Sequence, residues 1–254
     1  MALSLSLSSF LFGRENNRMP VHTYTNWNSR NSDQVEQIEP FRKYFFICEG
    51  ANTETFYFRR LIDLRKQLEI HPLIDIRLWE KTDEDKNLSF AKNLVAFAEK
   101  QKHNPDNDFD YERDKMIIVF DGDIFEEKVQ GYEELISQIE KTDIAGVTNP
   151  GFELFLLLHI EGSYEQYIEG HEKEYLSSDE DGKYSYAFDV LRKLTGMNAK
   201  KNPEIGNLAD NILIAISQEE NVNQDIHSLK GRISSNIGKI IKEIINEKPD
   251  ILKY

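Results

Sequence analysis

The chain has 254 residues, of which 39% are hydrophobic and 30% are charged, and its formal net charge is −14. These values fit a globular protein of one large domain, or one domain with an appended part, and argue against broad electrostatic binding of nucleic acid. The single cysteine excludes an intrachain disulfide, and no stretch approaches the ~20 apolar residues that a membrane helix needs.

The charge is distributed unevenly along the chain. Residues 41–182 carry 17 Lys or Arg against 32 Asp or Glu, whereas residues 183–254 carry 11 against 9. The acidic middle would gain from bound divalent cations. The C-terminal part is the better candidate for contacting phosphate, although a mixed-charge helical surface would have the same composition.

Residues 1–40 are rich in Ser, Asn, Arg and Gln and have no sustained periodicity, which predicts a flexible arm. The first 13 residues have no Lys or Arg before a short apolar stretch that serines interrupt, and no cleavage site is convincing. We therefore expect a cytoplasmic protein.

The first predicted strand covers 41–48 and ends in a continuous apolar run, as buried central strands do. Glu49 and Gly50 follow it directly, and apolar residues at helical spacing predict a helix from Thr53. Alternation over 73–79 predicts a second strand.

Two more strands are predicted, at 116–120 and at 144–147. The first of them leads directly into Asp121-Gly122-Asp123. Helical periodicity predicts the following helices: 88–103, 126–139, 152–160, 185–194, 208–218 and 237–245.

This alternation predicts an α/β fold, with a parallel sheet flanked by helices and a mostly helical C-terminal part. We divide the chain into a flexible arm (1–40), an α/β catalytic core (41–160) and a helical region (161–254). Ligands of parallel sheets bind beyond the C-terminal strand ends, and Glu49 and the Asp121-Gly122-Asp123 segment both fall there.

Asp121 and Asp123 can both face one cation if the turn between them curls, which Gly122 would permit by adopting a positive φ. Hard carboxylate oxygens suit Mg²⁺ or Mn²⁺. Glu49 adds a third acid, and clustered acids are costly unless a positive charge lies between them. A solvated turn or helix cap is the alternative for the Asp pair, and Glu49 could act instead as a general base or acid.

Glu153 opens a very apolar helix, where an acid is expensive to bury without a partner, although the helix dipole alone would favour it. His159 lies six residues further on and does not share that helix face, so a structural role competes with a catalytic one.

Two polar segments follow in the C-terminal region. Lys200 and Lys201 could neutralise a substrate phosphate, or could be ordinary surface lysines. The Ser234-Ser235-Asn236 segment could cap a helix or form an anion-holding helix start.

Three segments together resemble the RloB family. The first comprises Ile47-Cys48-Glu49-Gly50 with Thr53-Glu54 and Tyr57-Phe58. The second is Ile117 to Asp123, and the third is Thr148 to Phe155 continuing to His159. The third departs from the usual pattern at Gly151 and Phe155, neither of which is a proposed ligand.

The RloB family looks like a divergent branch of the Toprim proteins, so the resemblance implies a Toprim-like fold. It also implies that Glu49, Asp121 and Asp123 bind Mg²⁺ (or Mn²⁺) and perform acid/base chemistry. Glu153 and His159 carry over as motif positions. The resemblance further implies a role in phage defence, including abortive infection, and an ATPase partner of the AAA or ABC type.

We therefore expect a Mg²⁺-dependent nuclease, a hydrolase that cuts RNA (including transfer RNA) or DNA in antiviral defence. The alternative is a non-catalytic subunit that binds nucleic acid or nucleotide and regulates a defence ATPase. Nucleotidyl transfer is a third reading, but no template-binding module is identifiable in the sequence.

Overall fold

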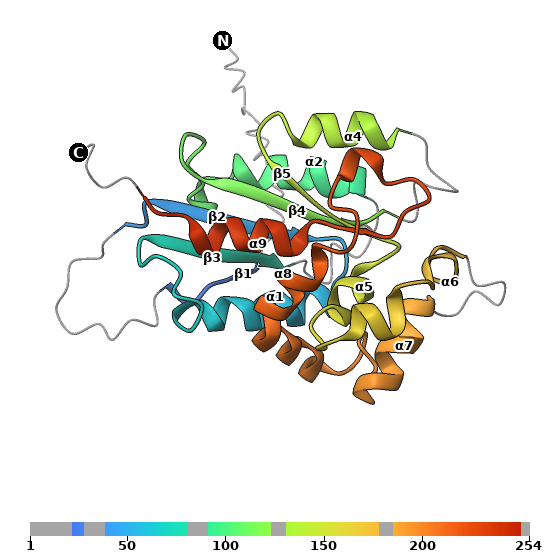
Figure 1. Ribbon diagram of the computed structural model, residues 1–254. Coiled ribbons are helices and arrows are strands. Elements are labelled where there is room, and N and C mark those ends of the chain that lie inside the picture. Colours follow the sequence, from blue (N-terminus) through green and yellow to red (C-terminus); the bar gives the residue numbers. More distant parts are fainter. Residues whose placement is uncertain (1–21, 28–38, 81–90, 123–130, 178–184, 250–254) are drawn as a thin grey trace, which may run out of the picture.

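The computed structural model describes residues 22–27, 39–80, 91–122, 131–177 and 185–249. A six-stranded sheet with the order β1-β3-β2-β4-β5-β6 lies at its centre (Figure 1). Its strands are β1 (His22–Tyr24), β2 (Arg42–Cys48), β3 (Ile74–Glu80), β4 (Lys115–Asp121), β5 (Ile144–Asn149) and β6 (Ser234–Ser235). The four central strands are parallel, as predicted, whereas the two edge strands are antiparallel, so the sheet is mixed.

Helices cover both faces of the sheet (Figure 1). The α-helices are α1 (Thr53–Asp63), α2 (Ala91–Lys102), α4 (Tyr132–Ile139), α5 (Phe152–Leu157), α6 (Glu172–Leu176), α7 (Tyr186–Thr195), α8 (Ile212–Glu219) and α9 (Ile237–Asn246). The 3₁₀-helical segments are η2 (Leu64–Lys66), η4 (Pro105–Asn107), η6 (Pro203–Asn211) and η7 (Ile226–Ser228), and η5 (Tyr164–Ile168) is a π-helix.

The two faces follow from the two-residue period of the strands. In β2, Phe45 and Ile47 pack with α2 and α4, whereas Phe46 and Cys48 pack with α1, α5 and the C-terminal helices. Because both faces are covered, the central strands consist of continuous apolar runs, which is the pattern that identified them.

Most predicted elements are present, with small shifts at their ends. The predicted helix 208–218 begins as the 3₁₀ segment η6 and continues as α8. Asp123, the start of the predicted helix 126–139 and the start of the predicted helix 88–103 lie outside the described residues. Within the described part of the chain, no helix is long and apolar enough to cross a membrane.

The prediction of a flexible arm over 1–40 is wrong for residues 22–27. β1 pairs with β3, and the Thr25 hydroxyl donates to the buried Asp75 carboxylate at 2.9 Å. The guanidinium carbon of Arg65 lies 4.8 Å from the centroid of the Trp27 ring. The edge of β3 and the η2 turn supply these partners, and local composition does not reveal either of them.

The C-terminal region is mostly helical, as predicted, but it also completes the sheet, because β6 pairs with β5. The predicted cap by Asn236 is wrong: its side chain instead accepts from Val147 N (2.7 Å) and donates to Ala145 O (2.8 Å) in β5. The anion at the start of α9 is internal, since the Glu219 carboxylate accepts from Gly238 N at 2.9 Å and Lys239 N at 2.8 Å.

Candidate functional site

The C-terminal ends of β2, β4 and β5 meet at one edge of the sheet. Cys48 pairs with Val119 and Asp121 pairs with Thr148, and Glu49 N donates to Val119 O at 2.9 Å. Adjacent strands are about 4.8 Å apart, so Glu49 and Asp121 lie on neighbouring strand ends. Both side chains are partly exposed.

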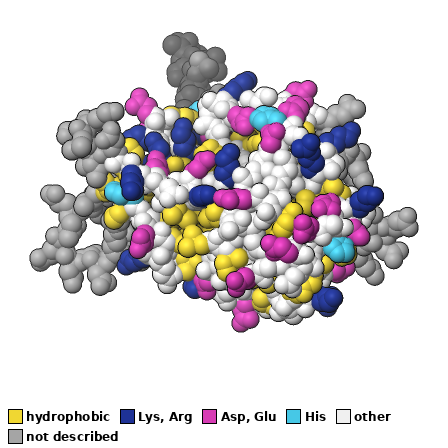
Figure 2. All heavy atoms as spheres, viewed as in Figure 1, with side chains coloured by type: hydrophobic (Ala, Val, Ile, Leu, Met, Phe, Trp, Pro, Cys, Tyr) yellow, Lys and Arg dark blue, Asp and Glu magenta, His cyan; other side chains and the backbone are white. Residues whose placement is uncertain are grey.

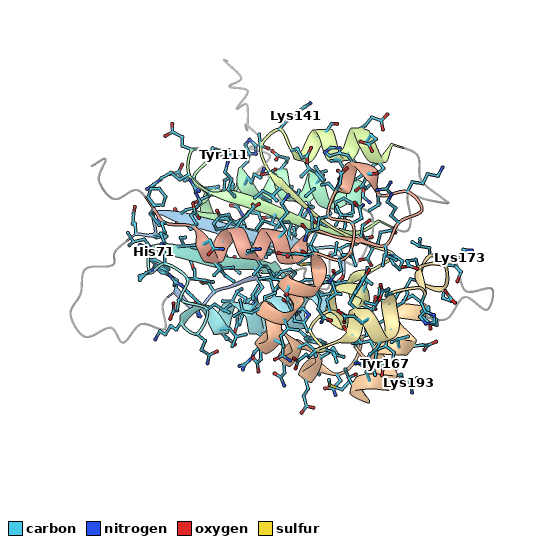
Figure 3. All side chains as sticks on the ribbon, in the orientation of Figure 1. His71, Tyr111, Lys141, Tyr167, Lys173 and Lys193 are labelled. Atoms are coloured by element: carbon cyan, nitrogen blue, oxygen red, sulfur yellow. The ribbon has the colours of Figure 1, made fainter. Side chains whose placement is uncertain are left out.

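Two labelled residues in Figure 3 mark the two ends of the molecule between which the strands run. His71, which precedes β3, lies at the opposite end of the molecule from Lys173 of α6. The strand ends that carry the acidic residues point toward the end where α5 and α6 lie (Figure 1).

Asp121 and Glu153 direct carboxylate oxygens toward the same position. The fully buried Thr148 donates its hydroxyl to Asp121 Oδ1 at 2.9 Å, which fixes the orientation of that carboxylate. A Cβ atom placed on Gly151 would lie 3.4 Å from Asp121 Oδ2 and 3.2 Å from Glu153 Oε2. The two carboxylates therefore converge on the space that the missing side chain of Gly151 leaves open.

Glu54 is an acidic residue of the edge that we did not predict as a site residue, although it belongs to the first resemblance segment. It lies in the first turn of α1, is 8% exposed, and covers Gly50 so closely that a Cβ there would be 2.0 Å from Glu54 Oε2. The sequence does contain a signal for this residue, namely an acid in the first helical turn after a strand end. Its burial over Gly50 depends on the tertiary structure.

Gly122 has a role that differs from the predicted one. Its φ is not in the left-handed region, so the expected curl is absent at this residue. A Cβ on Gly122 would lie 2.6 Å from Leu229 Cδ2 and 3.3 Å from Thr148 O. Glycine is required because the loop before β6 packs directly against the end of β4.

The donor set of this edge fits a hard divalent cation. Carboxylate oxygens are the ligands that Mg²⁺ and Mn²⁺ prefer, and oxygens of Asp121 and Glu153 both approach the position of a Gly151 Cβ. Among the described residues, which exclude Asp123, no group of three His, Cys, Asp or Glu side chains is close enough to hold a metal ion. The described chain thus contributes a converging pair of acids with a third on the adjacent strand.

His159 lies in the core, where it connects α5 to α1. It is fully buried, its Nδ1 lies 2.9 Å from Phe155 O, and its Nε2 lies 3.0 Å from the Tyr57 hydroxyl. A carbonyl only accepts, so Nδ1 carries the proton and Nε2 accepts from Tyr57. Burial lowers the pKa of His159 to about 4, so the ring is neutral, and its position is that of a structural histidine.

Lys200 and Lys201 are exposed in a turn after α7, and the fold brings this turn to the acidic edge. Asn52 Nδ2 donates to Lys200 O at 3.1 Å, and Thr53 Oγ1 donates to Ala199 O at 3.1 Å. Asn52 is only three residues beyond Glu49, so the predicted phosphate-binding pair lies beside the end of β2.

One face of the molecule carries side chains of both charges. Figure 2 shows basic and acidic side chains intermixed over this face. Several basic residues of the described chain are neutralised locally, including Arg59 by Glu80 and Arg60 by Asp210.

Comparison with known families gives one match. The family model described as RloB-like protein matches residues 44–244, which covers most of the chain and includes Glu49, Asp121 and Glu153. Neither the curated proteins nor the solved structures contain a significant match.

Proposed function

This chain belongs to the RloB-like protein family, and we propose that it is a metal-dependent nuclease that hydrolyses phosphodiester bonds of RNA, including transfer RNA, or of DNA. The observation that carries the proposal is the convergence of Asp121 and Glu153 at the C-terminal edge of the parallel strands. The Toprim-like resemblance adds Asp123 to this site. It also supports a role in antiviral defence alongside an ATPase.

Asp121 and Glu153, together with Asp123, would hold Mg²⁺ or Mn²⁺, and Glu49 would stand off the metal. When bound, the ion supplies positive charge that polarises a phosphoryl oxygen and stabilises the leaving oxygen. Thr148 holds the Asp121 carboxylate in place through its hydroxyl. Glu49, partly exposed on the adjacent strand end, accepts the proton of the attacking water, and the departing sugar oxygen takes a proton from solvent.

The test is a cleavage assay on transfer RNA, single-stranded RNA, and single- and double-stranded DNA, with Mg²⁺, Mn²⁺ or EDTA. We expect Asp121→Asn, Glu49→Gln and Glu153→Gln each to reduce the rate by at least about 100-fold, since each removes a ligand or a proton acceptor. Glu165→Gln, at an exposed glutamate on η5, is the matched control and should cleave like the wild type.

Two results would overturn the proposal. One is full activity in the three site variants, which would point to a contaminating nuclease. The other is a wild-type protein that cleaves none of these substrates with either metal, alone or with an ATPase partner of the AAA or ABC type.

A non-catalytic regulatory subunit is the second candidate. The net charge of −14, which disfavours broad electrostatic binding of a nucleic acid substrate, favours it. It predicts that the protein captures the ATPase, that nuclease activity belongs to the ATPase alone, and that Asp121→Asn leaves the activity of the mixture unchanged. Titration of the purified chain with Mn²⁺ would separate the two readings further, because only the nuclease requires a bound metal.

A further inference from the structure

Residues 190–203 form a basic segment in the C-terminal part of the described chain. They include Arg192, Lys193, Lys200 and Lys201 and no acidic residue, although the whole chain has a net charge of −14. All four cationic side chains are exposed. Such a local excess of positive charge in an acidic protein favours a polyanionic partner at this position.

The turn that carries Lys200 and Lys201 is held firmly against α1. Asn198 closes the turn by accepting from Lys200 N through Oδ1 (3.1 Å) and from Lys201 N through its carbonyl (3.0 Å). Ala199 is 1% exposed and bonds to Thr53, and Asn52 bonds to Lys200 O. The two lysines therefore project from a fixed backbone next to the acidic edge.

Close packing of η6 reinforces this placement. A Cβ on Gly206 would lie only 2.4 Å from Phe56 O, so the backbones of η6 and α1 touch directly. Side chains at the preceding turn are consequently presented in a constant position relative to Glu49 and Glu54.

Arg192 and Lys193 extend the same basic surface along α7. They occupy its last turn, which ends at Gly196 with a φ of 72°. Lys200 Nζ lies 5.8 Å from the centroid of the Phe188 ring, and Phe188 precedes Arg192 by one helical turn. The pair Arg192 and Lys193 is thus adjacent to the pair Lys200 and Lys201. Figure 3 shows Lys193 at the end of the molecule away from His71.

Ion pairing distinguishes three of these side chains from the arginines of α1. Arg192, Lys193 and Lys201 form no ion pair with any other residue that the structure describes. The guanidinium groups of Arg59 and Arg60 on α1, by contrast, are each paired with a carboxylate.

We propose that Arg192, Lys193, Lys200 and Lys201 form a phosphate-backbone contact surface that leads a nucleic acid strand to the carboxylate edge. The inference rests on the proposed function and assigns the surface that binds its substrate. Basic side chains spaced along a surface position a phosphate backbone without reading its sequence. An acidic protein partner would satisfy the lysines, but it has no phosphodiester to present to the adjacent carboxylates.

The experiment measures binding without chemistry. Fluorescence anisotropy of a labelled single-stranded oligonucleotide is recorded in EDTA from 50 to 300 mM salt, for wild type, Arg192→Gln/Lys193→Gln and Lys200→Gln/Lys201→Gln. For each pair we expect affinity at 100 mM salt to fall at least about tenfold. We also expect the slope of log K against log salt to become shallower by about 1.4, the value for two lost contacts on a single strand.

The matched control is Lys66→Gln/Lys141→Gln, which removes two exposed lysines from other elements and should bind like the wild type. Lys141 lies by α4, away from Lys193 in Figure 3. Circular dichroism of every variant checks that the fold is retained.

The proposal is overturned if neither pair changes affinity or slope, if the wild type binds no oligonucleotide, or if poly-glutamate of equal charge competes as well as the oligonucleotide. Its failure differs from failure of the proposed function. Lost binding in both basic pairs, with no cleavage by wild type, would retain the surface and remove the nuclease. Unchanged binding in both basic pairs, together with cleavage that depends on Asp121, would reject the contact surface and support the nuclease.

Discussion

At the scale of single residues, the site depends on where side chains are missing as much as on where acids are present. Gly50, Gly122 and Gly151 each occupy a place where a Cβ would contact a neighbouring side chain at or below 3.2 Å. Only Gly151 faces two carboxylates. Its φ of −156° is extended backbone that any residue adopts, so alanine there changes the site without straining the chain.

Gly151→Ala is therefore a sharp test of the site. The methyl group would lie 3.2 Å from Glu153 Oε2 and 3.4 Å from Asp121 Oδ2, and it would push the two oxygens apart. We expect Mn²⁺ affinity, measured by calorimetry, to fall at least about tenfold while the melting temperature changes little. Gly170→Ala is the control. A Cβ atom on Gly170 would have no other atom within 4 Å, although the φ of 79° at this residue adds local strain. Unchanged Mn²⁺ affinity in Gly151→Ala would remove the Asp121–Glu153 pair from the metal site.

At the scale of elements, one buried carboxylate joins α8 to α9 and β6. Glu219 is fully buried and accepts from the backbone of Gly238 and Lys239 and from the hydroxyl of Ser235, which is itself in β6. Burial raises the pKa of Glu219 to about 7, and the hydrogen bonds from Ser235 and the α9 backbone only partly oppose this.

This pKa predicts how stability depends on pH. The folded pKa of about 7 exceeds the reference value of 4.5, so the folded state binds more protons between these values. The stabilisation is complete below pH 4.5 and is lost as pH rises through 7, by about 3 kcal/mol. Urea unfolding of wild type and Glu219→Gln between pH 4.5 and 8 should show this decline in the wild type alone. If the free energy of unfolding varies with pH in the same way for both proteins, Glu219 is ionised over this whole pH range.

At the scale of the whole molecule, the two edges of the sheet are closed by segments distant from the central strands. β1 covers the edge of β3, and β6 covers the edge of β5. Uncovered edges are templates for pairing with other chains. The two short antiparallel strands therefore protect the sheet as well as extend it.

Removing the first of these strands should expose the edge of β3. Deletion of residues 1–27 takes away β1 and the Thr25 hydroxyl that donates to the fully buried Asp75, and deletion of residues 1–20 is the control that keeps both. We expect the longer deletion to lower the free energy of unfolding by about 1–3 kcal/mol and to increase self-association in light scattering. Equal stability of the two deletions would mean that β1 contributes nothing to the fold.

Local sequence patterns were sufficient for the central strands and most helices. The runs at 42–48 and 115–121 are apolar because both faces of those strands are buried, and burial of that kind leaves a readable signal. The strand assignments were also enough to predict that Glu49 and Asp121 lie at one edge of the sheet, because the C-terminal ends of parallel strands meet there.

Other features were decided only by the tertiary structure. These are the pairing of β1 and β6, the convergence of Asp121 and Glu153 on Gly151, the burial of Glu54, and the docking of the Lys200 turn on α1. Each joins segments far apart in the chain or depends on a contact of a few ångströms. Periodicity reports how one segment faces its surroundings, whereas the identity of the facing partner depends on how all the elements pack together.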